Sequence, residues 1–278
     1  MREILYDDIV KTVKELCIQA ATVLPDDLCR LLDEARETEI SPAGRSAMED
    51  ITENFRFAAE VGLPICQDTG ITVVFCKLGQ DAHITGGLLN DAVNEGVRQG
   101  YVNLRKSVVS DPLRRVNTGD NTPAVVHLEL TGGDRLEITV APKGAGSENM
   151  SKLKMFLPSS KREDIEKFAA ECIREAGANP CPPVVVGIGL GGTVEAAALL
   201  AKKALARPVG EANPDPYYAD MEASTLRRIN ATGVGPQGFG GIKTAVAVNI
   251  EVCAVHIASL PCVINVGCHA TRHASAVL

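Results

Sequence analysis

Apolar and polar residues alternate with a helical period at the start of this chain. Within residues 3–23 the apolar side chains recur every three or four positions, which predicts an amphipathic helix. A second helix is expected after Pro25. Ser41 and Pro42 supply an N-cap and a proline at the first helical position, and this third helix is expected to end at Gly62. The first part of the chain is therefore predicted to be helical.

Beyond residue 62 the pattern changes to short apolar runs, which predict strands. The predicted strands are residues 71–78, 124–130, 136–140, 184–190, 245–257 and 262–266, the second and third joined as a hairpin by the turn TGGD. Further helices are expected at residues 161–176, from 193 to about 206, and at 218–230. No linker divides the chain, so the prediction is one α+β domain over residues 1–278, with an N-terminal helical part followed by mixed α/β subdomains.

Composition and charge restrict the possible partners. The net charge of -7 argues against nucleic acid and against anionic membrane surfaces. No apolar run reaches the roughly 18 residues of a membrane span, and the charged N-terminus is unlike a secretory signal. A cytoplasmic protein with reduced cysteines is therefore expected.

The nine cysteines fall into two groups. Cys66, Cys181 and Cys268 flank glycine or proline in predicted turns, whereas the other six lie inside predicted elements, where packing explains them. Three thiols so far apart match neither a zinc knuckle nor a ferredoxin run, but they suit a site assembled by folding. Three thiolates on a cubane cluster would leave one iron open to bind a substrate oxygen as a Lewis acid.

Two glycine-rich segments are candidates for anion binding. GIGLGGT, residues 187–193, joins a predicted strand to a helix N-terminus, which suits a phosphate or carboxylate; a tight turn capped by Thr193 explains it equally well. In KGAGSEN, Gly144 and Gly146 allow the backbone to approach a ligand closely, and the alternative is a solvated loop.

Other charged residues are ambiguous on pattern alone. Arg105 has a guanidinium that matches a carboxylate, although a lone arginine at a helix end is commonly a surface charge. His256 lies in an apolar run, which favours a buried core histidine. His269, Arg272 and His273 are interpreted as a solvated tail.

A series of motifs resembles one known family. ICQDTG, NLR, KGAGSENMSKL, CPPVVVGIGLGGTVEAA, GPQGFGG and HIASLPCVINVGC, in this order, resemble the class I (iron–sulfur) fumarate hydratases and L-tartrate dehydratases. The likeness covers nearly the whole chain. In length the chain is similar to the alpha subunit of the two-subunit form, so the resemblance implies a separate beta subunit.

The resemblance also implies a site. A [4Fe–4S] cluster would be held by Cys66, Cys181 and Cys268, with one iron left for substrate; Cys262 is the alternative third ligand. Asp68 and His256 resemble the acid–base pair of the family. The residues that resemble its substrate-carboxylate contacts are Gln67, Arg105, Gly144 and Gly146.

The expected activity is reversible hydration of fumarate to malate, with L-tartrate dehydration as the alternative. A remote alternative is a nucleotide-binding protein that uses the GIGLGGT loop. The resemblance implies an alpha–alpha dimer within an α2β2 assembly acting on a small dicarboxylate. It also places the base that removes the carbon proton on the beta subunit, so the lone chain is expected to bind a cluster but to turn over poorly.

Overall fold

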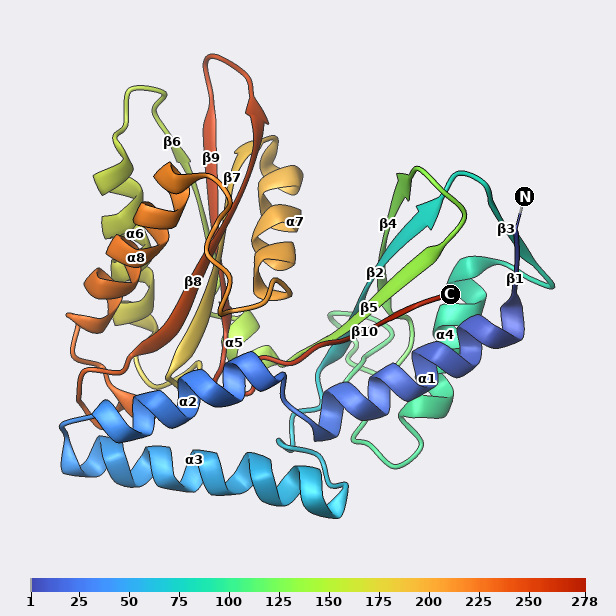
Figure 1. Cartoon of the computed structure of the whole chain (residues 1–278), viewed down its shortest axis with the longest axis horizontal. Helices are drawn as coiled ribbons and strands as arrows, with labels where there is room; N and C mark the ends of the chain where they lie inside the picture. The colour runs from blue at the N-terminus through green and yellow to red at the C-terminus, as the bar shows by residue number, and fades with distance from the viewer. Residues whose placement is uncertain (1) are drawn as a thin grey trace. The chain divides into compact units, whose positions relative to one another are not determined.

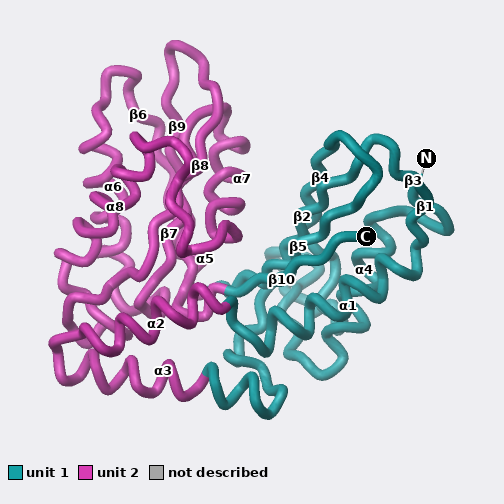
Figure 2. The backbone as a smooth tube through the Cα atoms, in the orientation of Figure 1, with its two compact units in different colours: residues 1–25, 55–145, 272–278 teal, residues 26–54, 146–271 magenta. Residues whose placement is uncertain are grey.

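The structure, a computed structural model, describes residues 2–278 (Figure 1). The chain divides into two compact units, each with its own hydrophobic core (Figure 2). Unit 1 contains the residues up to Pro25, Phe55–Ala145 and Arg272–Leu278, and unit 2 contains Asp26–Asn54 and Gly146–Thr271. Helices and mixed sheets in both units confirm the predicted α+β class.

Unit 1 is built on a four-stranded sheet in the order β10-β5-β2-β4. Its elements are β1 (Arg2–Leu5), α1 (Tyr6–Thr22), β2 (Ile71–Gly79), β3 (Ala82–Thr85), α4 (Leu89–Gly100), β4 (Val125–Thr131), β5 (Leu136–Lys143) and β10 (Ala274–Val277). Strand β2 runs parallel to β4 and antiparallel to β5, which also pairs antiparallel with β10. Helices α1 and α4 pack on each other, and apolar residues of α1, α4, β2 and β5 form the core.

The predicted hairpin between the strands on either side of TGGD is wrong. Strand β2 lies between β4 and β5, so the TGGD turn passes over the end of β2 instead of joining two neighbours (Figure 1). The backbone N–H of Gly79 donates to Arg135 O at 2.7 Å, and a Cβ at position 79 would stand only 2.4 Å from Gly133 O. The most apolar strand takes the central position because both of its faces can then be buried.

Unit 2 is built on a second four-stranded sheet, in the order β6-β9-β7-β8. Its elements are α2 (Asp26–Thr38), the first part of α3 (Pro42–Val61), most of α5 (Ala145–Glu148), β6 (Lys152–Phe156), α6 (Arg162–Ala176), β7 (Val184–Gly192), α7 (Val194–Leu205), α8 (Pro216–Asn230), the 3-10 turn η1 (Pro236–Gly238), β8 (Ala245–Val255) and β9 (Leu260–Gly267). Strand β7 pairs parallel with β8 and antiparallel with β9. Helices α6 and α8 cover one face of the sheet and α7 covers the other (Figure 1).

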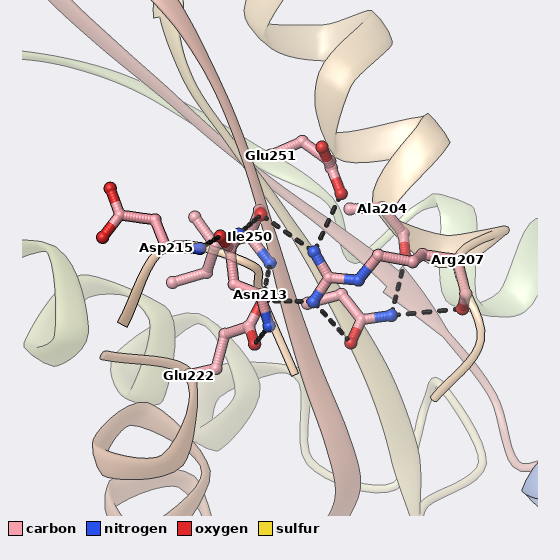
Figure 3. Close-up of polar contacts among 8 residues, drawn as sticks. Ala204, Arg207, Asn213, Asp215, Glu222, Ile250 and Glu251 are labelled. Atoms are coloured by element: carbon pink, nitrogen blue, oxygen red, sulfur yellow. Dashed lines mark hydrogen bonds and ion pairs between the residues drawn. The ribbon is translucent and has the colours of Figure 1, made fainter. Parts of the chain in front are cut away.

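The outer edge of β8 is closed by side chains from the loop after α7 and from α8 (Figure 3). The N–H of Ile250 donates to a carboxylate oxygen of Glu222 at 2.7 Å, and its carbonyl accepts from Arg207 at 3.1 Å and from Asn213 at 2.7 Å. Arg207 also forms ion pairs with Glu222 and with Glu251, the latter at 2.8 Å. Satisfying the backbone groups of an edge strand in this way prevents them from pairing with another chain.

The predicted helices and strands are present with small shifts in their bounds, but several elements were missed. Residues 2–5 form a strand where a helix was expected to begin, and β3, α4, β6 and β10 were not predicted. The solvated tail after Cys268 is wrong, because Arg272 is 5% exposed and β10 pairs with β5. No helix within residues 2–278 combines the length and the apolar character needed to cross a membrane.

Candidate functional site

The turn Cys66–Gly70 in unit 1 is held by its own hydrogen bonds. The N–H of Asp68 points at Cys66 Sγ at 3.4 Å, and the N–H of Gly70 donates to Asp68 Oδ1 at 3.0 Å. Gly70 has φ of 77°, and a Cβ there would stand 2.7 Å from backbone atoms of Lys143, at the end of β5. Only glycine fits this position, so the turn is seated directly on the sheet.

Thr69 connects the turn to the segment that carries Arg105. Its hydroxyl donates to the carbonyl of Arg105 at 2.6 Å, while its own carbonyl accepts from the hydroxyl of Tyr101 at 2.8 Å. Tyr101 is fully buried, and burial raises the pKa of its hydroxyl, which therefore stays a donor. Arg105 is exposed, so its guanidinium is accessible to a ligand.

Asp68 is placed against the KGAGSEN loop within unit 1. Its Oδ2 accepts the N–H of Ala145 at 2.8 Å, and a Cβ at position 144 would stand 3.0 Å from the same oxygen. Gln67 is exposed, with its Oε1 3.6 Å from Cys66 Sγ. Unit 1 thus places Asp68 against Gly144 and joins the turn, through Thr69, to the backbone of Arg105; the roles of these residues at a site stay a prediction.

Cys181 and Cys268 are held close to each other in unit 2. His269, which follows Cys268, donates its N–H to the carbonyl of Cys181 at 3.3 Å, and its ring Nδ1 is 3.0 Å from the same oxygen. Gln237 donates from its backbone and its side chain to the carbonyl of Pro182, at 2.8 and 2.6 Å. Two segments that are far apart in the sequence are therefore joined at the predicted ligands.

The backbone at Cys181 is strained. Its φ of 53° lies in the left-handed region, which costs a residue other than glycine about 1–3 kcal/mol. Such strain persists where surrounding contacts determine it, and here the carbonyl of Cys181 is held by His269. The thiol is exposed. Strain at an exposed, reactive side chain is typical of functional sites.

The chemistry of the thiols fits a ligand set. Cys66 and Cys268 are half-buried and Cys181 is exposed, so each thiol is accessible to a ligand. Burial raises the pKa of Cys76 and Cys172 to about 11, and that of Cys17 and Cys262 to about 12. Cys262 lies inside β9 and is 0% exposed, which favours Cys268 as the third ligand.

The set of three cluster ligands, Cys66, Cys181 and Cys268, stays a prediction. Within residues 2–278 there is no group of three or more His, Cys, Asp or Glu side chains gathered as metal ligands. Cys66 belongs to unit 1, whereas Cys181 and Cys268 belong to unit 2. Cys253, expected to be packed, is exposed at the end of β8.

His256 lies at the opposite end of the unit 2 sheet from Cys181 and Cys268. It follows β8, whose Val255 pairs with Gly192 at the end of β7, whereas the two thiols flank the pair Val185–Gly267 at its beginning. The length of β7 separates the two ends by roughly 25–30 Å. The interpretation of His256 as a buried core histidine is wrong, because it is exposed. Its Nδ1 accepts the N–H of Ala258 at 3.1 Å, which leaves Nε2 for a reacting group.

The GIGLGGT segment forms the turn between β7 and α7. The hydroxyl of Thr193, at the N-cap position, donates to Glu195 Oε1 at 2.6 Å. A carboxylate therefore occupies the first turn of α7, where a phosphate-binding loop would need positive potential.

The comparisons with known proteins agree with these observations. The model of the family described as Fumarate hydratase (Fumerase) matches residues 10–277, so the chain belongs to this family. The chain is 43% identical over 270 residues, 94% of each chain, to a Methanocaldococcus jannaschii protein provisionally named L(+)-tartrate dehydratase subunit alpha. It is 32% identical over 271 residues to the L(+)-tartrate dehydratase subunit alpha of Escherichia coli K12 and to that of Shigella boydii serotype 4, with 95% of this chain and 88% of each relative covered.

Proposed function

We propose that the chain is the alpha subunit of an iron–sulfur hydro-lyase that acts on a small dicarboxylate. The observation that carries this proposal is the turn Cys66–Gly70, where a candidate cluster ligand precedes a carboxylate that contacts Gly144 and Ala145. The names of the relatives favour L-tartrate as the substrate. The family description supports fumarate and malate as the second candidate.

Cys66, Cys181 and Cys268 would hold the [4Fe–4S] cluster. Their exposure and the N–H directed at Cys66 Sγ support this set, because cluster thiolates commonly accept such hydrogen bonds. When bound, the iron without a protein ligand supplies a Lewis acid for the substrate hydroxyl. With three thiols as ligands, one iron would have no protein ligand and would be left for the substrate.

The side chains of unit 1 would orient the substrate and move a proton. The planar fork of Arg105 suits a substrate carboxylate, and Gln67, which is also exposed, would be a further donor. Asp68, in its protonated form, would deliver a proton to the departing hydroxyl oxygen. In the reverse direction the same oxygen of Asp68 would take that proton from water. The proton on the adjacent carbon would be removed by a base of the beta subunit.

The position of His256 supports an alpha–alpha dimer in which the site is shared. Within one chain, His256 and the pair Cys181–Cys268 lie at opposite ends of the same sheet. A histidine at that end can serve as partner to Asp68 at the cluster if it comes from a second copy of the chain. All residues from Val252 to Ala258 are exposed, which leaves His256 accessible to such a copy.

Anaerobic loading with iron and sulfide, followed by assays with L-tartrate and with malate, tests this function. We expect a visible cluster spectrum for the lone chain, little turnover, and full activity after addition of the beta subunit. The assembly would be α2β2 and cytoplasmic. Full turnover by the lone chain would contradict the proposal that the beta subunit supplies the base. Nucleotide binding without iron uptake would favour the alternative in which the GIGLGGT loop binds a nucleotide.

A further inference from the structure

The C-terminal segment places a buried cation, the guanidinium of Arg272, beside the turn that carries Cys66. Arg272 is 5% exposed, and its Nη2 donates to the carbonyl of Asp68. Among the residues that the structure describes, its Nε finds no hydrogen-bond partner. None of the ion pairs found within residues 2–278 includes Arg272. The guanidinium is thus buried beside the turn, and the hydrogen bond found for it among residues 2–278 is to a neutral carbonyl.

Other poorly exposed arginines of the chain have carboxylate partners. Arg207 is paired with Glu222 and Glu251, and Arg162 is paired with Glu166 and Asp220 (Figure 3 shows Arg207 and its polar partners). A buried charge without a counter-charge is strongly unfavourable, and proteins normally pair such a group or place it where an anion binds. No carboxylate within residues 2–278 forms an ion pair with Arg272, so an anion bound from outside the chain would supply its counter-charge.

The surroundings of Arg272 identify where this anion would bind. The carboxylate of Asp68 already accepts the N–H groups of Gly70 and Ala145. Arg272 also acts on the hydroxyl of Tyr101. Burial raises the pKa of this hydroxyl, and the positive charge of Arg272 opposes that increase. The same residue joins Arg272 to the Cys66 thiol, because the carbonyl of Asp68 accepts from Arg272 and the N–H of Asp68 points at Cys66 Sγ at 3.4 Å.

We propose that Arg272 is a positioning residue that holds the Asp68 carbonyl and supplies the counter-charge for an anionic cluster at Cys66. This rests on the proposed function, since a [4Fe–4S]²⁺ core with three thiolates carries net negative charge. A fixed cation beside such a cluster favours its reduced form and strengthens its retention. The apo chain, in contrast, carries Arg272 as an uncompensated charge.

The test compares Arg272→Met, Arg272→Lys and the control Arg207→Met in the full chain. Cluster retention is measured as iron loss to a chelator, the cluster potential by anaerobic redox titration, and apo stability by thermal melting. For Arg272→Met we expect roughly 10–100-fold weaker retention and a more negative potential, with an apo melting temperature at or above that of the wild type. Arg272→Lys should keep most of the potential. Arg207→Met should melt lower and leave the cluster potential unchanged.

The outcomes separate this proposal from the function on which it rests. A wild-type chain that takes up no cluster would refute the proposed function. A wild-type chain that holds a cluster, with Arg272→Met matching its potential and retention, would overturn the role of Arg272 alone. A fall in the apo melting temperature of Arg272→Met, as large as that of Arg207→Met and without a change in the cluster, would show a purely structural residue.

Discussion

The two ends of strand β7 differ in how the chain closes them. At the beginning of the strand, the carbonyls of Cys181 and Pro182 are held by His269 and Gln237. At its end, the residues from Val252 to Ala258 are all exposed although most of them are apolar. One end of the sheet is thus complete within a single chain, and the other presents an accessible histidine among apolar side chains.

Along β8 the change from a covered edge to an exposed one occurs within a few residues. Its edge is closed by Arg207, Asn213 and Glu222 at Ile250, two residues before the exposed stretch begins at Val252 (Figure 3). The chain therefore covers its edge strand at Ile250 and leaves the strand exposed around His256. This contrast supports a cluster site at one end and a contribution to a second copy at the other.

Removal of a thiol from the closed end should have the largest effect. Cys181→Ser and Cys268→Ser should each abolish the cluster absorbance after anaerobic loading, because three thiolates are required to hold it. Cys262→Ser is the matched control on the same strand, and it should keep the spectrum because that thiol is buried with a pKa raised to about 12. A spectrum lost in Cys262→Ser but kept in Cys268→Ser would reverse the assignment.

The open end should matter for turnover and not for the cluster. His256→Asn should keep the spectrum and lower kcat by about 10²–10⁴-fold, the range for loss of a proton-transfer group. If His256 acts on a second copy, an equimolar re-associated mixture of His256→Asn and Cys268→Ser chains with the beta subunit should regain roughly a quarter of wild-type activity. About half of the dimers are then mixed, and one of the two sites in each mixed dimer is intact.

A mixture of Cys181→Ser and Cys268→Ser chains is the control for that complementation. Both changes damage the same end of the sheet, so no mixed dimer contains an intact site and activity should stay absent. No recovery in the first mixture would place His256 and the thiols in the site of one chain, whereas recovery in the control would show that Cys181 and Cys268 of one site come from different chains. Activity per protein at equal chain concentration is the measurement.

Local chemistry explains which features the sequence could predict. The turn at Cys66 is short, and its glycine, carboxylate and hydroxyl act on residues within a few positions, so its character is visible in the sequence. The TGGD turn has equally clear chemistry, yet the hairpin prediction failed because β2 inserts between the two strands. Turn residues indicate that the chain changes direction, but they do not indicate which strand each of the two connected strands pairs with.

Long-range pairing explains the features that could not be predicted. Arg272 and β10 looked like a solvated tail because four residues carry little periodicity, and their burial depends on β5, far away in the sequence. His256 lies in an apolar run of the kind that is usually buried, but the run extends beyond the helices that cover the sheet. Contacts with distant segments or other chains decide both cases.

The closed edge of β8 should contribute strongly to stability. Arg207→Ala should lower the free energy of unfolding by about 3–5 kcal/mol, because it leaves the buried carboxylate of Glu222 without its cation. Arg174→Ala is the control, since its pair with Glu171 is exposed and should contribute about 0–1 kcal/mol. Denaturant titration of the apo chain measures the stability of both variants. Equal losses of stability would refute the importance of the side chains that cover the β8 edge at Ile250.

The smallest expected effect concerns the strain at Cys181. Cys181→Gly and Cys181→Ala both remove the thiol, so they differ only in how well they tolerate φ of 53°. Glycine adopts this conformation without a Cβ clash, and Cys181→Gly should therefore be more stable than Cys181→Ala by about 1 kcal/mol in the apo chain. The comparison is made by denaturant titration under anaerobic conditions. If the two variants are equally stable, the turn is relaxed in solution, and the closed end of β7 is less rigid than its hydrogen bonds to His269 and Gln237 indicate.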